Sequence, residues 1–455
     1  MGGDFIITNY GPISSAFARS LLVDLCVPGV GVQTGPFGSQ LHASDYVERG
    51  TPIITVEHIG DNRIIHDNLP FVSDEDRTRL SKYSLKKGDI VFSRVGSVDR
   101  RAIVHLNEDG WLFSGRCLRV RPDRNKIDPG YLSWFMGLPG FKEYIRQIAV
   151  GATMPSLNTA ILSKVVIFFP PSLKDQQAIA CILGTLDDKI EINRRMNQTL
   201  EVMARAIFKS WFVDFDPVRA KAAGQPPPGQ PPHIAELFPD SFVDSELGEI
   251  PRGWRIGKIQ DLGEVICGKT PPTSEPDNYG DDVPFVTIPD MHGKVFVTAT
   301  GKSLSKKGAA TQKNKFLPPF SICVSCIATP GIVALTSIYC QTNQQINSVV
   351  PSDPNSSLFC YFVLRGLGDQ IRSHGAGGSV LLNLNKGQFS LMKTILPPAN
   401  ESLVFHNITL PIFMKILVNQ KQCEILESIR DTLLPKLISG ELRVPDAERI
   451  VGRCT

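Results

Sequence analysis

The stretch that decides the fold is "DDKIEINRRMNQTLEVMARAIFKSWF", residues 187–212. Apolar residues recur along it at helical spacing, and the stripe continues upstream. One heptad position holds Ile179, Leu186, Asn193, Leu200 and Ile207, and the other holds Leu183, Ile190, Asn197, Ala204 and Trp211. So narrow a stripe favours packing against a long partner helix, although an ordinary amphipathic core helix would show a similar pattern. Because Gly184 weakens the upstream part, we expect a secure helix from about Leu186 to Phe212.

A second stretch near the C-terminus repeats this pattern: "ITLPIFMKILVNQKQCEILESIRDTLLPKLISGEL", residues 408–442. A constant offset in numbering (416 − 190 = 226) aligns Ile190 with Ile416 and Asn193 with Asn419. An apolar strand ending in two prolines precedes each helix, "KVVIFFPP" (164–171) and "KTILPP" (393–398). We expect Pro411 in the first turn of the second helix, and Pro435 to end or kink it.

The segments upstream of the helices also resemble each other. "KKGDIVFSRVG" (86–96) resembles "PPFSICVSCIA" (318–328), and "GATMPSLNTAIL" (151–162) resembles "GAGGSVLLNLNKGQF" (375–389). A period this long indicates a duplicated domain. The predicted fold class is α+β, with two pseudo-repeated globular domains joined by two long helices that form an antiparallel coiled coil.

Six segments follow from this organisation. The predicted bounds are 1–172 for the first globular domain, 173–219 for the first long helix, 220–250 for a proline-rich linker, 251–398 for the second globular domain, 399–443 for the second long helix, and 444–455 for a tail. The proline content of "AKAAGQPPPGQPP" marks the linker as extended.

Composition is that of a folded chain, with 42% hydrophobic and 20% charged residues among 455. No uninterrupted apolar run approaches the roughly 18 residues of a membrane span, and the N-terminus lacks the layout of a signal peptide. We therefore expect a cytoplasmic protein, whose ten scattered cysteines are buried free thiols.

Charge is unevenly distributed along the chain, although the net charge is only +3. Residues 77–126 hold 13 basic and 5 acidic side chains, and residues 291–352 hold six lysines and no carboxylate. Either cluster alone would be read as a solvated face. Two such clusters in one chain favour a polyanionic partner, and nucleic acid fits best.

Three long motifs resemble the specificity (S) subunit of type I restriction-modification enzymes. They are "LDDKIEINRRMNQTLEVMARAIFKSWFVDFDPVRAK" (186–221), "LFPDSFVDSELGEIPRGWRIGKIQDL" (237–262) and "LLPKLISGELRV" (433–444). "GDIVFSRVGS" (88–97) and "TMPSLN" (153–158) are similar to that family's first recognition domain. The resemblance covers nearly the whole chain in the right order.

The resemblance implies a DNA-binding chain with two target-recognition domains, each reading half of a split site in double-stranded DNA. The two long helices are then a spacer and a docking surface. The resemblance further implies two methyltransferase subunits and two restriction/translocase subunits as partners, which carry the catalysis. We expect this chain to bind no cofactor or metal, with S-adenosylmethionine, ATP and Mg²⁺ on the partner subunits.

Motifs for chemistry of the chain's own are weak. "TGKS" (300–303) lacks the first glycine of a phosphate-binding loop, because Phe296 stands there. Cys323 and Cys326 have no second pair at zinc-ribbon spacing, so buried thiols are the better interpretation. Two alternatives stay open: a nuclease or methyltransferase with a duplicated DNA-binding region, and a purely structural coiled-coil scaffold.

Candidate DNA contacts fall into two classes. For phosphates the candidates are Lys86, Lys87, Arg100 and Arg101 in the first domain and Lys302, Lys306, Lys307, Lys313 and Lys315 in the second. For bases they are Arg94 and Arg116, whose forked guanidinium suits guanine, followed by Ser156, Asn158, Asn383 and Asn385. Each residue taken singly could equally be a surface or loop-capping side chain. The second domain offers Cys326 in place of Arg94, so the two half-sites should differ.

Two asparagines stand in the helical stripes at equivalent places, Asn193 and Asn419. In an antiparallel pair these amides would lie close together near the middle of both helices. A buried asparagine pair lowers stability but penalises slipped registers. We expect the pair to fix the register, and with it the distance between the two reading domains.

Overall fold

The computed structural model describes residues 4–36, 40–151, 153–227, 229–327, 329–375 and 384–452. The chain divides into two compact units. Unit 1 comprises Met1–Ile190 and Ile425–Thr455, and unit 2 comprises Glu191–Glu424. Each unit therefore contains one part of each long helix.

Unit 1 begins with twelve short strands and the first helices. The strands are β1 (Phe5–Thr8), β2 (Gly11–Ser14), β3 (Ala18–Leu21), β4 (Val32–Thr34), β5 (Tyr46–Val47), β6 (Thr51–Ile54), β7 (Phe71–Val72), β8 (Ile90–Ser93), β9 (Arg101–Ile103), β10 (Leu112–Phe113), β11 (Cys117–Val120) and β12 (Val166–Phe169). The α-helices are α1 (Asp74–Arg79), α2 (Pro129–Phe135), α3 (Pro139–Ile148), α4 (Thr159–Ser163) and the start of α5 (Leu173–Phe212), with α13 (Val444–Val451) near the C-terminus.

Unit 2 has a matching set. Its strands are β13 (Phe242–Val243), β14 (Ile250–Pro251), β15 (Arg255–Lys258), β16 (Gly263–Cys267), β17 (Tyr279–Val286), β18 (Phe296–Val297), β19 (Ser303–Leu304), β20 (Ile322–Ser325), β21 (Val333–Thr336), β22 (Gln341–Thr342), β23 (Ile346–Pro351) and β24 (Lys393–Leu396). Its α-helices are α6 (Asp216–Ala222), α7 (Pro232–Ala235), α8 (Ile288–Met291), α9 (Lys306–Ala310), α10 (Ser357–Gly375), α11 (Lys386–Ser390) and most of α12 (Ala399–Ser439).

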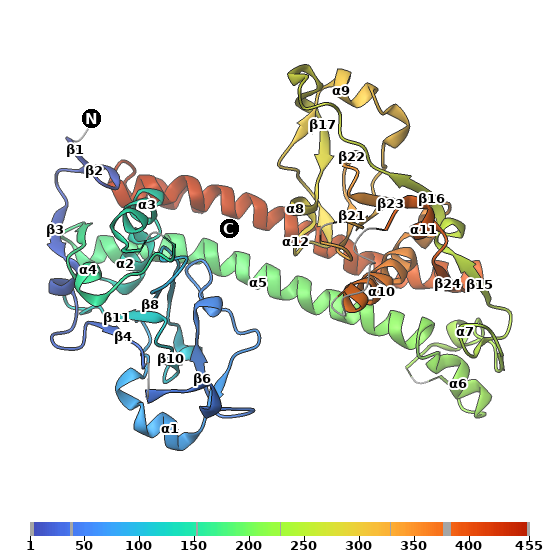
Figure 1. The fold of residues 1–455 in the computed structure, drawn as a ribbon, viewed down its shortest axis with the longest axis horizontal. Coiled ribbons are helices and arrows are strands. Elements are labelled where there is room, and N and C mark those ends of the chain that lie inside the picture. The colour runs from blue at the N-terminus through green and yellow to red at the C-terminus, as the bar shows by residue number, and fades with distance from the viewer. Residues whose placement is uncertain are drawn as a thin grey trace. The chain divides into compact units, whose positions relative to one another are not determined.

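Two small sheets form the body of unit 1 (Figure 1). One has the strand order β4-β11-β8-β9 and is antiparallel, and the other has the order β10-β6-β7-β5. Ile53 and Ile54 from β6 share a buried cluster with Val91 from β8 and Phe113 from β10. The body of unit 1 is thus held by an apolar core that both sheets line.

Unit 2 repeats this topology. Its sheets have the orders β16-β23-β20-β21-β18 and β19-β17-β22, and β22 runs parallel to β17 as β10 does to β6. The numbering of β20 exceeds that of β8 by the same amount (322 − 90) as separates the two resembling sequence segments (318 − 86). The predicted duplication is therefore confirmed, and the central strands of the first unit have counterparts in the second.

The long helices keep the predicted repeat but not all predicted ends. The first residues of α12 and α5 differ in number by the offset that aligns their sequences (399 − 173 = 416 − 190). α5 begins well before Leu186, because buried Ile179 and Leu183 outweigh the cost of about 1 kcal/mol that one helical glycine carries. Pro411 and Pro435 both lie inside α12, which ends at Ser439 before Gly440 at φ +78°. The prediction that Pro411 lies in the first turn was wrong, and Pro435 does not end the helix. Buried residues beside each proline, such as Phe413 and Leu437, hold the helix despite the lost hydrogen bonds.

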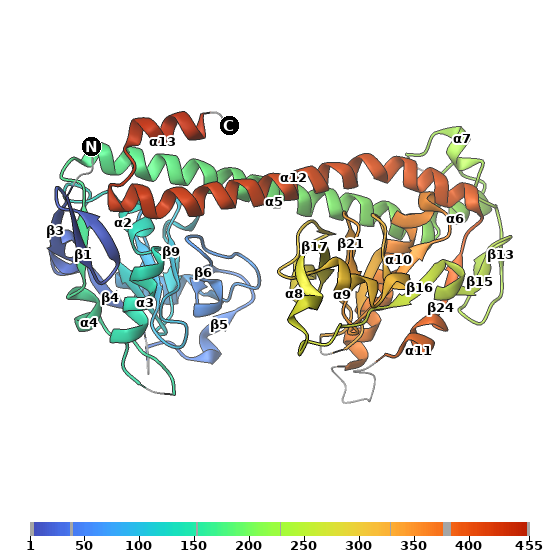
Figure 2. The ribbon, with the colours of Figure 1, turned by 90° about the horizontal axis from the view of Figure 1, so that it is seen from above.

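α5 and α12 pack antiparallel in each unit (Figure 2). In unit 1, Arg430 donates to the Asp187 carboxylate at 2.8 Å. In unit 2, Asn193 donates to Gln422 at 3.0 Å, and Asn419 donates to Asn197 at 2.8 Å. Residue numbers that rise along one helix thus fall along the other.

The amide contacts differ from the predicted Asn193–Asn419 pair. Asn419 meets Asn197 from the other stripe, and Asn193 meets a glutamine. Asn193 and Asn419 are buried, and Asn197 also donates to the Ile416 carbonyl at 3.4 Å. The seam therefore holds two amide pairs, Asn193–Gln422 and Asn197–Asn419, because two antiparallel helices stagger the equivalent positions instead of facing them directly.

α12 is long and apolar enough to cross a membrane by length and composition alone. The sequence showed no uninterrupted apolar run, because a few polar residues are spread through this segment. Phe405, Phe413 and Ile416 of this helix pack in the core of unit 2, which accounts for its apolar character.

Candidate nucleic-acid interface

The base-contact candidates of unit 1 gather where β8 ends. The Arg94 N–H donates to the Arg116 carbonyl at 2.9 Å, and the Arg94 carbonyl accepts from the Leu157 N–H at 2.8 Å. Val95 forms a β-bridge with Ser156, two residues before Asn158. Three segments far apart in sequence thus converge, and we call Arg94, Arg116, Ser156 and Asn158 the reading edge of unit 1.

An open cavity of about 920 Å³ lies at this edge. Its lining comprises Pro36, Leu41, His42, Tyr46, Thr55, Val56, Glu57, Arg94, Val95, Arg100, Ser114, Gly115 and Arg116. The Arg94 guanidinium donates to the Gly115 carbonyl at 3.0 Å, and Thr55 donates to the Glu57 carboxylate at 3.1 Å. The cavity therefore combines three cationic side chains with one oriented carboxylate, which suits base edges beside a phosphate backbone.

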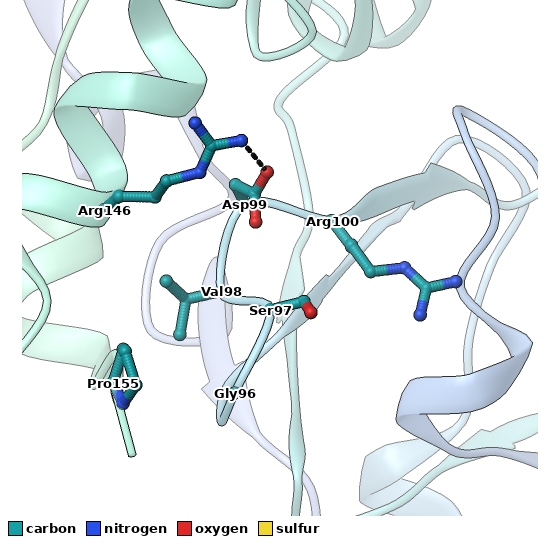
Figure 3. Close-up of a pocket in the computed structure, with 7 residues that line it drawn as sticks. All are labelled: Gly96, Ser97, Val98, Asp99, Arg100, Arg146 and Pro155. Carbon is teal, nitrogen blue, oxygen red and sulfur yellow. Dashed lines mark hydrogen bonds and ion pairs between the residues drawn. The ribbon is translucent and has the colours of Figure 1, made fainter. Parts of the chain in front are cut away.

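A second cavity of about 510 Å³ is lined by residues 96–100, Arg146 and Pro155 (Figure 3). Arg146 donates to the Asp99 carboxylate at 2.7 Å, whereas the Arg100 side chain extends away from this ion pair. Arg100 lines both cavities. Its half-exposed guanidinium is thus well placed for a phosphate.

Arg101 is not a phosphate contact, contrary to the sequence prediction. Its side chain is 2% exposed and donates to the Ser133 carbonyl at 2.8 Å and to Asp61 at 3.0 Å. Burial lowers the pKa of the Arg101 guanidinium, and the Asp61 carboxylate opposes this. Neighbours along a strand point to opposite faces, so Arg100 stays accessible while Arg101 enters the core.

Lys86 and Lys87 are exposed but lie at the other end of the sheet. Both precede β8, whereas Arg94 follows it, and four strand residues span about 13 Å. Lys86 and Lys87 thus lie apart from the reading edge, and any phosphate that they contact is a different one from a phosphate beside Arg94.

The asparagine candidates serve partly as helix caps. The Asn158 side-chain oxygen accepts from the Ile161 N–H at 2.8 Å, and that of Asn385 accepts from the Gln388 N–H at 2.9 Å. The Asn158 side chain is exposed at the reading edge, so its NH₂ group can still donate. Ser156 is half-buried, and Asn383 lies outside the described residues.

Unit 2 has an edge with the same backbone hydrogen bonds as the reading edge of unit 1, but with different side chains. The Cys326 N–H donates to the Gln345 carbonyl at 2.9 Å, and the Cys326 carbonyl accepts from the Leu384 N–H at 3.1 Å. Cys326 is thus the counterpart of Arg94, as the sequence alignment predicted, and Gln345 is the counterpart of Arg116. Burial raises the pKa of both Cys323 and Cys326 to about 11, so these thiols stay neutral and inert. Among the nine cysteines described, Cys181 is exposed and Cys267 half-buried, against expectation.

The lysines of unit 2 surround a short helix. Ser305 caps α9, which starts with Lys306 and Lys307, and Lys302 and Lys313 flank it as exposed side chains. Lys307 pairs with Asp277 at 3.2 Å, and Lys315 donates to the Cys267 carbonyl at 2.6 Å. Lys302, Lys306 and Lys313 are the more available cations.

Sequence reasoning missed three polar side chains at the two edges: Glu57, Gln344 and Gln345. Glu57 lies in a segment without any basic cluster. Gln345 is not found by the sequence offset that aligns Cys326 with Arg94, because the two differences in numbering disagree (345 − 116 = 229 against 326 − 94 = 232). Only the strand pairing shows that Gln345 takes the place of Arg116. In the part of the chain that the structure describes, no group of three or more His, Cys, Asp or Glu side chains could hold a metal ion.

Comparison with known proteins gives one consistent result. The family model described as type I restriction modification DNA specificity domain matches residues 38–202 and 251–438. The chain is 38% identical over 424 residues to the type I restriction enzyme HindI specificity subunit of Haemophilus influenzae, covering 84% of this chain and 92% of that protein. It is 29% identical over 320 residues to the MjaIX specificity subunit of Methanocaldococcus jannaschii, covering 70% and 69%.

The fold agrees as well. The crystal structure of the type I restriction-modification S subunit from M. genitalium superposes with a TM-score of 0.58 at 15% identity, covering 92% of this chain and 96% of that one. Two matched regions, the duplicated sheets and the paired helices lead to one conclusion: the chain belongs to the type I restriction-modification DNA specificity family, as a non-catalytic specificity subunit that recognises the DNA target.

Proposed function

We propose that this subunit recognises a bipartite, asymmetric site in double-stranded DNA, with one half read by each unit. The observation that carries the proposal is the pair of reading edges. The same hydrogen bonds hold Arg94 beside Arg116 in unit 1 and Cys326 beside Gln345 in unit 2. The backbone is arranged in the same way in both units, but the side chains differ. Each unit therefore reads a different DNA sequence.

The chemistry of the edges supports direct contact with bases. A forked guanidinium donates to both O6 and N7 of guanine, which the major groove presents. The exposed Arg116 is free to do so, and the carbonyl contact fixes the position of the Arg94 fork. Arg100 in unit 1 and Lys302, Lys306 and Lys313 in unit 2 then supply phosphate contacts, which give affinity without sequence information.

The paired helices are the proposed spacer and docking surface for two methyltransferase subunits and, through them, two restriction/translocase subunits. Apolar side chains stand exposed on both helices within unit 2: Ile192, Met196, Val202 and Met203 on α5, and Met414 and Val418 on α12. Exposed apolar side chains of this number on one helix pair fit a protein interface. The partners would hold S-adenosylmethionine, ATP and Mg²⁺, in the cytoplasm.

Methylome sequencing of a host that expresses the complete set of subunits tests the proposal. We expect methylated adenine within a motif of two different halves separated by unread bases. A single continuous motif, or a motif with two identical halves, would contradict it. DNA cleavage or methyl transfer by this chain alone would favour an enzyme instead.

A further inference from the structure

A pair of glutamines forms the turn before β23 in unit 2. Gln345 precedes Ile346, which pairs with Ser325 of β20, just as Arg116 precedes Cys117, which pairs with Ser93 of β8. Gln344 consequently takes the place of Gly115. Where unit 1 has a glycine and an arginine, unit 2 thus presents two amide side chains, and we call Gln344 and Gln345 the glutamine turn.

Local hydrogen bonds orient both amides. The Gln345 side-chain oxygen accepts from the Asn343 amide at 3.1 Å, and the Asn343 oxygen accepts from the Gln345 N–H at 3.1 Å. Thr270 donates to the Gln344 side-chain oxygen. Within the described ranges neither glutamine NH₂ group donates to a protein acceptor, and Gln344 is exposed. Each amide is therefore held by its oxygen and presents its NH₂ group outward.

The surroundings of the turn are less charged than those of the arginines in unit 1. Cys326 is a neutral thiol, and the numbering offset between the units (322 − 90 = 289 − 57) places Pro289 where unit 1 has Glu57. Lys315 is held at the Cys267 carbonyl, and the exposed Lys269, next to Thr270, is a point charge that suits a phosphate better than a base edge. Discrimination at this edge consequently rests on amides. A glutamine amide matches adenine, since its NH₂ donates to N7 and the second lone pair of its oxygen accepts from N6.

We propose that the glutamine turn reads adenine in the half-site of unit 2, whereas the arginines of unit 1 read guanine. This inference rests on the proposed bipartite recognition and adds the base class to it. The two half-sites then differ in composition, with at least one A·T pair specified through Gln344 or Gln345.

The test uses the complete methyltransferase complex of this chain and methylome sequencing. The variant Gln344→Ala/Gln345→Ala should accept any base at one or two A·T positions of one half-motif, with discrimination reduced about 5- to 150-fold. The other half-motif stays unchanged. Gln345→Arg should shift one of these positions towards guanine. Gln260→Ala removes an exposed glutamine elsewhere in unit 2 and should leave the motif as it is.

The possible outcomes distinguish a failure of this inference from a failure of the proposed bipartite recognition. If the parent complex methylates no bipartite motif, the proposed function fails. If it does, and the double variant keeps the full motif or changes the half-motif of unit 1, the glutamine turn does not read adenine. If the double variant methylates nothing, the single variants Gln344→Ala and Gln345→Ala decide. The inference is overturned if neither of them relaxes an A·T position in the half-motif of unit 2.

Discussion

The two reading edges share a backbone and differ in side chains. In both units the residue after the central strand donates to the carbonyl before the neighbouring strand and accepts from the leucine before a short capped helix. Arg94 and Arg116 occupy this frame in unit 1, and Cys326 and Gln345 occupy it in unit 2. Burial and backbone hydrogen bonds maintain the frame, while side chains at its rim are free to change without cost to the fold.

The largest expected effect concerns the helices that both units share. Four residues inserted into α5 and four into α12, between the Asp187–Arg430 contact and the Asn193–Gln422 contact, lengthen each helix by about 6 Å and nearly keep its face. We expect both half-motifs to persist with the spacer lengthened by about two base pairs, at about 3.4 Å per pair. Two-residue insertions rotate the face by about 200° and should abolish recognition.

Methylome sequencing distinguishes the insertions. Sites with the original spacer in the four-residue variant would mean that the helices do not set the distance. Full activity of the two-residue variant would mean that the seam does not matter.

The next effect compares Arg94 with Cys326. Arg94→Ala should weaken discrimination at one position of a half-motif about 5- to 150-fold, because the guanidinium fork is lost. Arg94→Lys keeps the charge without the fork and should relax the same position. Cys326→Ala should change the other half-motif little, since a buried neutral thiol offers few contacts. Methylation rates on duplexes with single base changes measure all three, and equal effects of the two alanine variants would remove the distinction between the edges.

These comparisons show how far the sequence reaches. The equivalent positions of Asn193 and Asn419 in two similar segments predicted the duplication and the paired helices. They did not predict that Asn419 would meet Asn197, because the stagger of antiparallel helices depends on packing in three dimensions. The chemistry of the guanidinium group was enough to select Arg94 and Arg116 as candidates. The burial of Arg101 could not be predicted, because only the strand geometry shows that Arg100 and Arg101 point to opposite faces.

The seam offers a smaller effect, on stability. Asn419→Ala leaves the half-buried Asn197 oxygen without its donor and should lower the free energy of unfolding by about 1–3 kcal/mol. The double variant Asn197→Leu/Asn419→Leu should cost less than the sum of the single leucine variants. Denaturant unfolding measures this, with the exposed Gln198→Ala as control. Additive costs would mean that the two amides do not act as a pair.

The smallest effect concerns the lysines. Lys302→Gln, Lys306→Gln and Lys313→Gln together should weaken binding to all sequences alike and lower the salt slope by about 1 for each phosphate that is no longer neutralised. Lys86→Gln/Lys87→Gln should leave the slope unchanged, because these residues lie at the far end of β8. Binding titrations of the complex at several salt concentrations measure both slopes. If the Lys86→Gln/Lys87→Gln variant lowered the slope and the unit 2 variant did not, the phosphate contacts would lie elsewhere than proposed.

The central claim is that each unit reads its own half of the site. Replacing residues 20–172 with the equivalent segment of a relative that has another specificity exchanges the reading edge of unit 1 and leaves the glutamine turn in place. Methylome sequencing of the complete complex with this chimaera should show one half-motif changed and the other retained. A change in both halves, or in neither, would contradict the account.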